Sequence, residues 1–204
     1  MSLGIRCALV LGPVWMTISP LLAIAQSGGQ QVCFGEYVLC DAAPCAANQN
    51  YQDGDDIDCY CHKPGPGLNI ANSVCDARQQ SNLSTYSLRN IDPHYGEPAR
   101  AWGCTADELL ANGKGWAFCL DAPCRRDESH AGGWTCTCKY MDPRKHATTM
   151  YTFGAPSGAS DPCQRDCNTN WSGATWSELL TGYSALALMY SDHIVLRFCA
   201  ATGP

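Results

Sequence analysis

Two groups of six cysteines follow one another along the chain with a similar order of spacings. In both groups, four residues ending in Ala-Pro separate the second cysteine from the third, and a Cys-x-Cys follows. The first group comprises Cys33, Cys40, Cys45, Cys59, Cys61 and Cys75, and the second comprises Cys104, Cys119, Cys124, Cys136, Cys138 and Cys163. A repeated order of this kind indicates a duplicated unit. We therefore expect two related six-cysteine units.

The N-terminal residues have the features of a secretory signal peptide. Arg6 is the only charged residue before the apolar run 8–22, which leads to the small residues of Ala23-Ile24-Ala25. A short apolar run that ends in a small-x-small site is typical of a cleaved signal, and an uncleaved anchor is the alternative. The sequence therefore predicts a signal peptide over residues 1–25 and a secreted or periplasmic protein. No later segment reaches the roughly 18 apolar residues that a membrane-spanning helix requires.

The number of cysteines predicts how the exported chain is stabilised. Of the 15 cysteines, Cys7 lies in the signal, so 14 remain, an even number. A domain of roughly 60 residues is marginally stable without cross-links, and each disulfide contributes about 2–4 kcal/mol. In an oxidising compartment all 14 are therefore predicted to form disulfides. Cys167 and Cys199 lie outside the two groups, and we predict that they pair with each other.

The chain divides into segments that differ in composition. After the signal we predict a flexible leader over 26–32, a first cysteine-rich unit over 33–75, a connector over 76–103, a second unit over 104–167 and a helix-strand tail over 168–204. The expected fold class is a small disulfide-rich protein, mainly β and irregular, made of two tandem related units plus a short C-terminal helix and strand.

Local signals predict two helices and one late strand. Thr105 and Glu108 have the spacing of a capping box, and Asn112-Gly113 ends that helix. Ser172 is predicted to cap the second helix. The apolar face of this second helix comprises Trp176, Leu179, Leu180, Tyr183, Leu186 and Ala187. Residues 194–198 are predicted to form a buried strand.

The cysteine spacings resemble those of EGF-like modules. The first group has the order C-x(6)-C-x(4)-C-x(13)-C-x-C-x(13)-C, and the stretch 132–138 is similar to the aromatic-x-Cys-x-Cys strand of that family. The resemblance implies that the first cysteine pairs with the third, the second with the fourth and the fifth with the sixth. The implied bridges are Cys33–Cys45, Cys40–Cys59, Cys61–Cys75, Cys104–Cys124, Cys119–Cys136 and Cys138–Cys163. The family's acidic calcium consensus is missing, so calcium binding is not implied, and another duplicated disulfide fold is the alternative.

Two motifs raise the question of metal binding. The Cys-x-Cys pairs beginning at Cys59 and Cys136 could hold a soft metal through thiolates, and the carboxylates between Asp53 and Asp58 could hold calcium. Oxidised cysteines offer no thiolate, and the acidic run lacks the order of an EF-hand, so disulfides and a solvated turn are favoured. We predict no metal site and no cofactor, and keep a metal- or thiol-redox protein as one alternative.

Motifs for catalysis are missing from the sequence. There is no Gly-x-Ser-x-Gly and no His-Glu-x-x-His. The histidines are scattered at His62, His94, His130, His146 and His193. Carboxylates and histidines that folding brings together leave no local signature. A small secreted hydrolase therefore stays as another alternative, although no catalytic residue is predicted.

Aromatic residues provide the candidate binding residues. They concentrate in the second unit and its connector, and the predicted set is Trp102, Trp116, Trp134, Tyr140 and Tyr151. Exposed, such rings anchor a protein interface or stack on sugar faces, whereas buried they belong to the core. The leading hypothesis is an exported binding or structural protein without intrinsic catalysis.

Charge narrows the class of partner. The chain has 13 Lys+Arg against 19 Asp+Glu and a net charge of −6. An acidic protein is a poor ligand for nucleic acid, so the expected partner is a protein or a neutral glycan. Asn82-Leu83-Ser84 and Asn170-Trp171-Ser172 match the glycosylation sequon, which is used only in a host that glycosylates.

Overall fold

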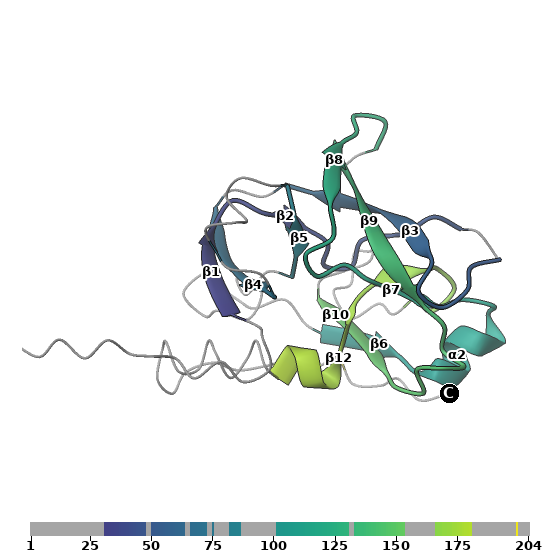
Figure 1. The fold of residues 1–204 in the computed structure, drawn as a ribbon. Helices are drawn as coiled ribbons and strands as arrows, with labels where there is room; N and C mark the ends of the chain where they lie inside the picture. The colour runs from purple at the N-terminus through teal and green to yellow at the C-terminus, as the bar shows by residue number, and fades with distance from the viewer. Residues whose placement is uncertain are drawn as a thin grey trace, which may run out of the picture.

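The computed structural model describes residues 31–47, 50–63, 66–72, 75, 82–86, 101–130, 133–153, 166–180 and 199. Within these ranges the protein is mainly β (Figure 1). The elements are β1 (Gln31–Gly35), β2 (Val38–Leu39), β3 (Asp56–His62), β4 (Gly67–Ala71), β5 (Ser84–Thr85), β6 (Ala101–Cys104), α2 (Ala106–Ala111), β7 (Trp116–Phe118), β8 (Cys124–Arg126), β9 (Gly133–Met141), β10 (Met150–Phe153), β11 (Trp171–Ser172) and β12 (Ala174–Thr175). The predicted class, disulfide-rich and mainly β, is confirmed.

The largest sheet joins strands of the first cysteine group and its connector, β2, β3 and β5, to strands from the second half of the chain, β7, β8, β9 and β11. Its hydrogen-bonded order is β11-β7-β9-β3-β2-β5, and β8 pairs with β9. At its centre, β3 and β9 run antiparallel over seven residue pairs, from Asp56 opposite Lys139 to His62 opposite Gly133. In β3 the side chains of Ile57, Cys59 and Cys61 are buried, and the residues between them face outward, as expected for a strand with one covered face.

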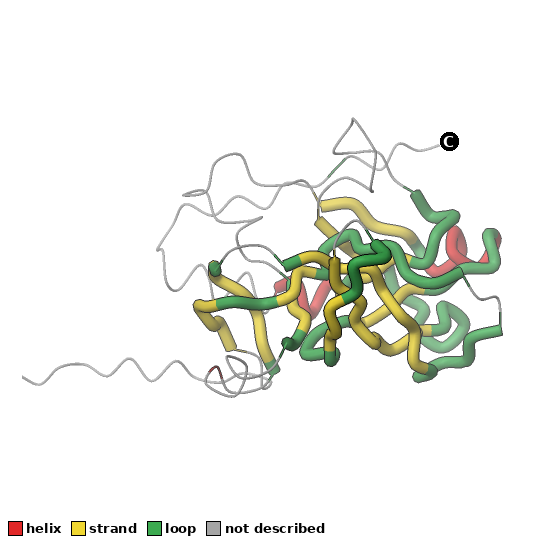
Figure 2. Tube along the Cα trace, turned by 90° about the horizontal axis from the view of Figure 1, so that it is seen from above, coloured by secondary structure: helices red, strands yellow, loops and turns green. Residues whose placement is uncertain are grey.

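Two smaller sheets flank the central one. β1 pairs with β4, and β10 lies between β12 and β6. Figure 2, seen from above, shows the strands of the three sheets lying together with α2 at the edge. Gln31 and Val32 were predicted to lie in a flexible leader, but they belong to β1 and pair with Ala71 and Ile70. The predicted signal peptide lies outside the described residues.

The disulfides are nested rather than interleaved. In the first group Cys33 pairs with Cys75, Cys40 with Cys61 and Cys45 with Cys59. In the second group Cys119 pairs with Cys138 and Cys124 with Cys136, whereas Cys104 pairs with Cys167, a cysteine outside the predicted six. Both sets of three bridges are therefore nested, and in the second set Cys167 takes the outermost place that was predicted for Cys163. The pairing implied by the EGF-like resemblance is wrong in both groups.

The bridge predicted between Cys167 and Cys199 is also wrong, because Cys167 closes the second group with Cys104. Loop length alone favoured the shorter separation, whereas folding brings Cys167 next to β6. Cys199 is itself disulfide-bonded, and Cys163 lies outside the described residues. Of the six bridges between described residues, five join two cysteines of the same group, and the sixth joins Cys104 to Cys167, which lies outside the predicted second group.

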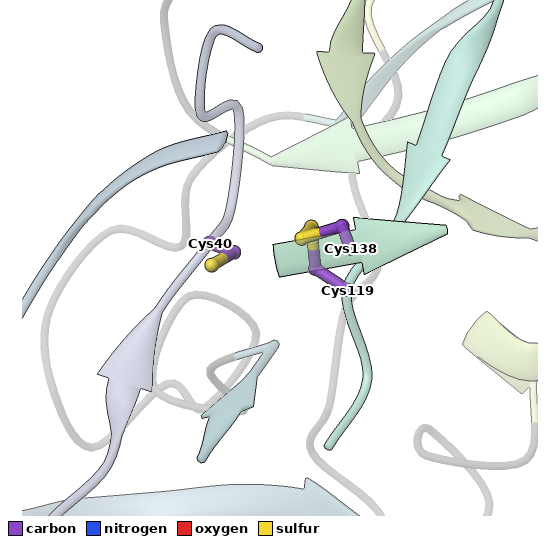
Figure 3. Close-up of side chains that lie close together, drawn as sticks. All are labelled: Cys40, Cys119 and Cys138. Atoms are coloured by element: carbon purple, nitrogen blue, oxygen red, sulfur yellow. A yellow bond between two sulfur atoms is a disulfide. The ribbon is translucent and has the colours of Figure 1, made fainter. Parts of the chain in front are cut away.

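Cystines fill the core between the two groups. Cys40, Cys119 and Cys138 have sulfur atoms within 4.8 Å of one another (Figure 3), and Cys40, Cys61 and Cys136 form a second such set. These half-cystines pack with Val38, Ile57 and Ala117. Every one of these sulfurs is in a disulfide. None of them is therefore a thiolate that could bind a metal ion.

The helix predictions are confirmed at one site and corrected at the other. Thr105 caps α2, and Glu108 completes the predicted capping box. In the tail, a helical turn begins at Trp176. Ser172 does not cap this turn, because it lies buried in β11. The remaining positions of the predicted helix, from Tyr183, and the strand over 194–198 lie outside the described residues. No described helix is long and apolar enough to cross a membrane.

Candidate functional site

Most of the aromatic residues predicted to bind a partner are core residues. Trp102 and Trp116 are each only 1% exposed, and Tyr140 is also buried. Trp102 and Trp116 pack in one cluster with Trp171, and the rings of Trp102 and Trp171 meet edge to face at 5.9 Å. These side chains cannot contact a partner while the protein is folded.

Trp134 is partly exposed but is covered by a cation. The ammonium of Lys63 lies 5.4 Å from the centre of the Trp134 ring. Lys63 also forms an ion pair with Glu36, with 2.6 Å between Nζ and Oε2. A lysine over a tryptophan face is a favourable cation–π contact, which occupies one side of this ring.

Tyr151 contributes to an open cavity on the surface. The cavity has a volume of about 310 Å³ and is lined by Thr148, Thr149, Tyr151 and Trp176. We call it the aromatic pocket. The rings of Tyr151 and Trp176 lie 5.7 Å apart at an angle of 53°. Trp176 is 41% exposed, so this residue contributes to the solvent-accessible surface beside Tyr151.

A glycine beside β10 makes room for the Tyr151 ring. Tyr151 lies in β10 between Gly103 of β6 and Ala174 of β12. A Cβ atom at Gly103 would lie 2.9 Å from Cδ1 of Tyr151 and 2.6 Å from the carbonyl oxygen of Met150. Since real Cβ atoms do not approach that closely, any side chain at position 103 would displace β10 or the ring.

A capping box places Trp176 at the start of its helical turn. The Glu178 carboxylate accepts hydrogen bonds from the backbone N–H of Thr175, at 2.7 Å, and from the Thr175 hydroxyl, at 2.8 Å. Trp176 follows this N-cap directly. The periodicity of the tail assigned Trp176 to the apolar face of the predicted helix. The Thr-x-x-Glu signal at Thr175 was the sequence feature that could have located the helix start.

A second cluster corresponds to the histidine–carboxylate pair expected of a hydrolase. Nε2 of His146 lies 2.8 Å from Oδ1 of Asp53, and Nζ of Lys145 lies 3.9 Å from Oδ2. The Asp53 carboxylate also accepts the backbone N–H of Asp142, at 3.1 Å. The pKa of Asp53 is lowered, first by that N–H group and then by His146. Neither His146 nor Asp53 lines the aromatic pocket. His94 and His193 lie outside the described residues.

Comparison with known proteins provides no relative for this chain. No family model matches it, and no curated protein or solved structure shows significant similarity.

Proposed function

We propose that this protein is an exported, disulfide-stabilised recognition protein without intrinsic catalysis, and that it binds an uncharged saccharide in the aromatic pocket. The observation that carries the proposal is the exposed indole of Trp176 held against Tyr151 at the mouth of an open cavity. Exposed aromatic rings that are rigidly held supply large contact areas at a small cost in conformational entropy.

The lining of the pocket matches the chemistry of a sugar ring. A pyranose has an apolar C–H face, which packs on an aromatic ring, and a rim of hydroxyl groups. The two aromatic rings provide the apolar surface, and Thr148 and Thr149 carry hydroxyl groups that both donate and accept hydrogen bonds. None of the four described lining residues is charged, so the described part of the pocket offers no counter-ion for an anionic or cationic ligand.

The charge of the whole chain supports the same ligand class. At a net charge of −6, the protein repels polyanions such as nucleic acids and acidic polysaccharides at long range. A protein partner with a basic patch is the other partner that this charge permits.

We further propose that the two cysteine groups are copies of one duplicated unit. Both have the same nested pairing, and both have a left-handed residue two positions after their second cysteine, at Ala42 and Asp121. Export in the oxidised form is consistent with a chain whose described cysteines are all in disulfides.

The proposal is tested by titrating the protein with uncharged oligosaccharides. Hexasaccharides of β-linked glucose, xylose, mannose and N-acetylglucosamine are added while the amide and indole signals are followed by NMR. Binding should shift the signals of Tyr151 and Trp176. Trp176→Ala and Tyr151→Ala should each weaken binding about tenfold or more, as expected for aromatic anchors. Phe34→Ala is the matched control, because Phe34 is 62% exposed and does not line the pocket.

Three results would contradict the proposal. The first is that none of the four sugars shifts the pocket signals. The second is that Trp176→Ala binds as tightly as the unaltered protein. The third is the release of new reducing ends from a bound oligosaccharide, which would support the hydrolase alternative, and His146→Ala would then be tested for loss of that activity.

A further inference from the structure

We propose that the turn Cys40–Cys45 of the first cysteine group positions the aromatic pocket, through hydrogen bonds to Thr152 and Ser172. This inference rests on the proposed function, since it assigns positioning residues to the same pocket. Thr152 and Ser172 do not line the pocket themselves. They precede or follow its aromatic residues in the chain, and both are buried.

Thr152 holds the strand that carries Tyr151. Its hydroxyl accepts a hydrogen bond of 2.6 Å from the backbone N–H of Ala42, 110 residues away in the chain. Successive side chains of a strand point to opposite faces. Thr152 therefore fastens β10 to the turn from the inner face, while Tyr151 points to the pocket on the outer face.

Ser172 holds the segment that leads to Trp176. Its hydroxyl accepts a hydrogen bond of 3.0 Å from the N–H of Ala43 and donates one to the carbonyl of Cys40. Its own N–H donates to the carbonyl of Ala43 at 2.9 Å. β12 begins two residues later and pairs with β10, with Ala174 opposite Tyr151. The turn thus contacts the two segments that bear the two rings.

The turn is well suited to hold two segments at a set distance. Its first and last residues are tied to β3 by the bridges Cys40–Cys61 and Cys45–Cys59. Pro44 lies within it, and Ala42 has a left-handed φ of 44°. With both ends cross-linked and one φ angle restricted by proline, the turn presents the N–H groups of Ala42 and Ala43 with little freedom.

A matching contact elsewhere in the molecule provides a control. The hydroxyl of Ser84 donates to the carbonyl of Cys119 and accepts from the N–H of Ala122 at 3.0 Å. Ser84 therefore holds the turn of the second group as Ser172 holds that of the first. It is equally buried, but it does not lie next to a residue of the aromatic pocket. Removing its hydroxyl should lower stability without moving Tyr151 or Trp176.

The experiment compares four variants of the full mature chain. Thr152→Val and Ser172→Ala remove a hydroxyl with little change of shape, Thr152→Ser keeps the hydroxyl, and Ser84→Ala is the control. We expect Thr152→Val and Ser172→Ala to weaken saccharide binding about tenfold, and Thr152→Ser to bind nearly normally. Ser84→Ala should bind normally even if its melting temperature falls as far as that of Ser172→Ala.

A readout without ligand separates this inference from the proposed function. Proton–proton NOEs between the rings of Tyr151 and Trp176 report their distance in the free protein. They should weaken in Thr152→Val and Ser172→Ala and persist in Ser84→Ala. If no saccharide binds, the proposed function fails, and the NOEs still decide the positioning role. Unchanged NOEs in Thr152→Val and Ser172→Ala, or equal losses in Ser84→Ala, would overturn it.

Discussion

Cys59 lies directly opposite Cys136 where β3 pairs with β9. Each of these cysteines closes the innermost bridge of its own group, with Cys45 and Cys124 respectively. On either side of this pair, Ile57 faces Cys138 and Cys61 faces Trp134. The contact between the two cysteine groups is therefore an antiparallel strand pairing centred on the fourth cysteine of each group.

This relationship predicts that the two halves stay together after the connector is cut. No bridge between described residues joins 31–86 to 101–180. Hydrogen bonds nevertheless connect the halves. Ser84 of the first half donates to the carbonyl of Cys119 in the second, and Ser172 of the second half donates to the carbonyl of Cys40 in the first. A specific protease site inserted between residues 87 and 100 allows cleavage of the folded protein. The fragments should co-elute in native size-exclusion chromatography and separate in denaturant without reductant.

Separation of the cut fragments in native buffer would mean that the two halves are independently folded units, and it would contradict the expected association. Continued association in denaturant without reductant would reveal a disulfide between them. The uncut protein with the same insertion is the control for both measurements.

Asn170 should be a structural residue rather than a glycosylation site. It is 3% exposed, its Oδ1 accepts the N–H of Gly115 at 3.1 Å, and its Nδ2 donates to the carbonyl of Ala46 at 3.1 Å. Asn170→Ala should lower the free energy of unfolding by about 1–3 kcal/mol, because the buried N–H of Gly115 and the partly buried carbonyl of Ala46 lose their partner. Denaturant unfolding measures this change.

Asn82 provides the comparison, because it begins the other sequon and is exposed. Asn82→Ala should change the free energy of unfolding by less than about 0.5 kcal/mol. In a glycosylating host, Asn82 should accept a glycan in folded, secreted protein and Asn170 should not. A folded protein with a glycan on Asn170 would contradict the hydrogen bonds that this side chain makes.

Acid should weaken the contact between the loop at Asp53 and the turn at Asp142. The folded pKa of Asp53 is lowered, so the folded state favours the ionised carboxylate. This contribution to stability is present above the unfolded pKa, near 3.9, and is lost as the pH falls through the folded pKa. Asp53→Asn should therefore make the fall in unfolding free energy between about pH 5 and pH 2 less steep.

The two causes of the lowered pKa can be separated. His146→Gln should reduce this acid dependence less than Asp53→Asn does, because the N–H of Asp142 is the larger cause and remains. Denaturant unfolding at a series of pH values measures both slopes. Equal slopes for Asp53→Asn and the unaltered protein would show that this contact adds no stability.

The disulfide of Cys199 should be formed with Cys163. Twelve cysteines pair among themselves in six bridges, and Cys199 is also bridged. Of the 15 cysteines in the chain, only Cys7 and Cys163 remain, and Cys7 belongs to the predicted signal peptide. Peptide mapping without reduction should recover one peptide pair that contains Cys163 and Cys199. A free thiol at Cys163 in the mature protein would contradict this assignment.

Several features could be read from residues close together in the sequence. The count and order of cysteines predicted a disulfide-rich β protein, and Thr105 with Glu108 predicted the start of α2. Such predictions succeed because a cap involves groups within one helical turn. The pairing of the cysteines, in contrast, joins residues that are far apart in the sequence. Six cysteines allow 15 pairings, and the entropy of loop closure changes too slowly with length to choose among them.

The candidate site depended on the fold as a whole. Trp102 and Trp176 are the same residue type, yet one is enclosed by Trp171 and the other stands at the surface beside Tyr151. Their difference arises from which strands lie over each ring, and strand pairing joins residues far apart in the chain, as at Tyr151 and Gly103. The sequence by itself determined the class of protein and its cross-linking chemistry. Only the tertiary structure decided which sulfurs met and which aromatic rings stayed exposed, because both depend on contacts between distant segments.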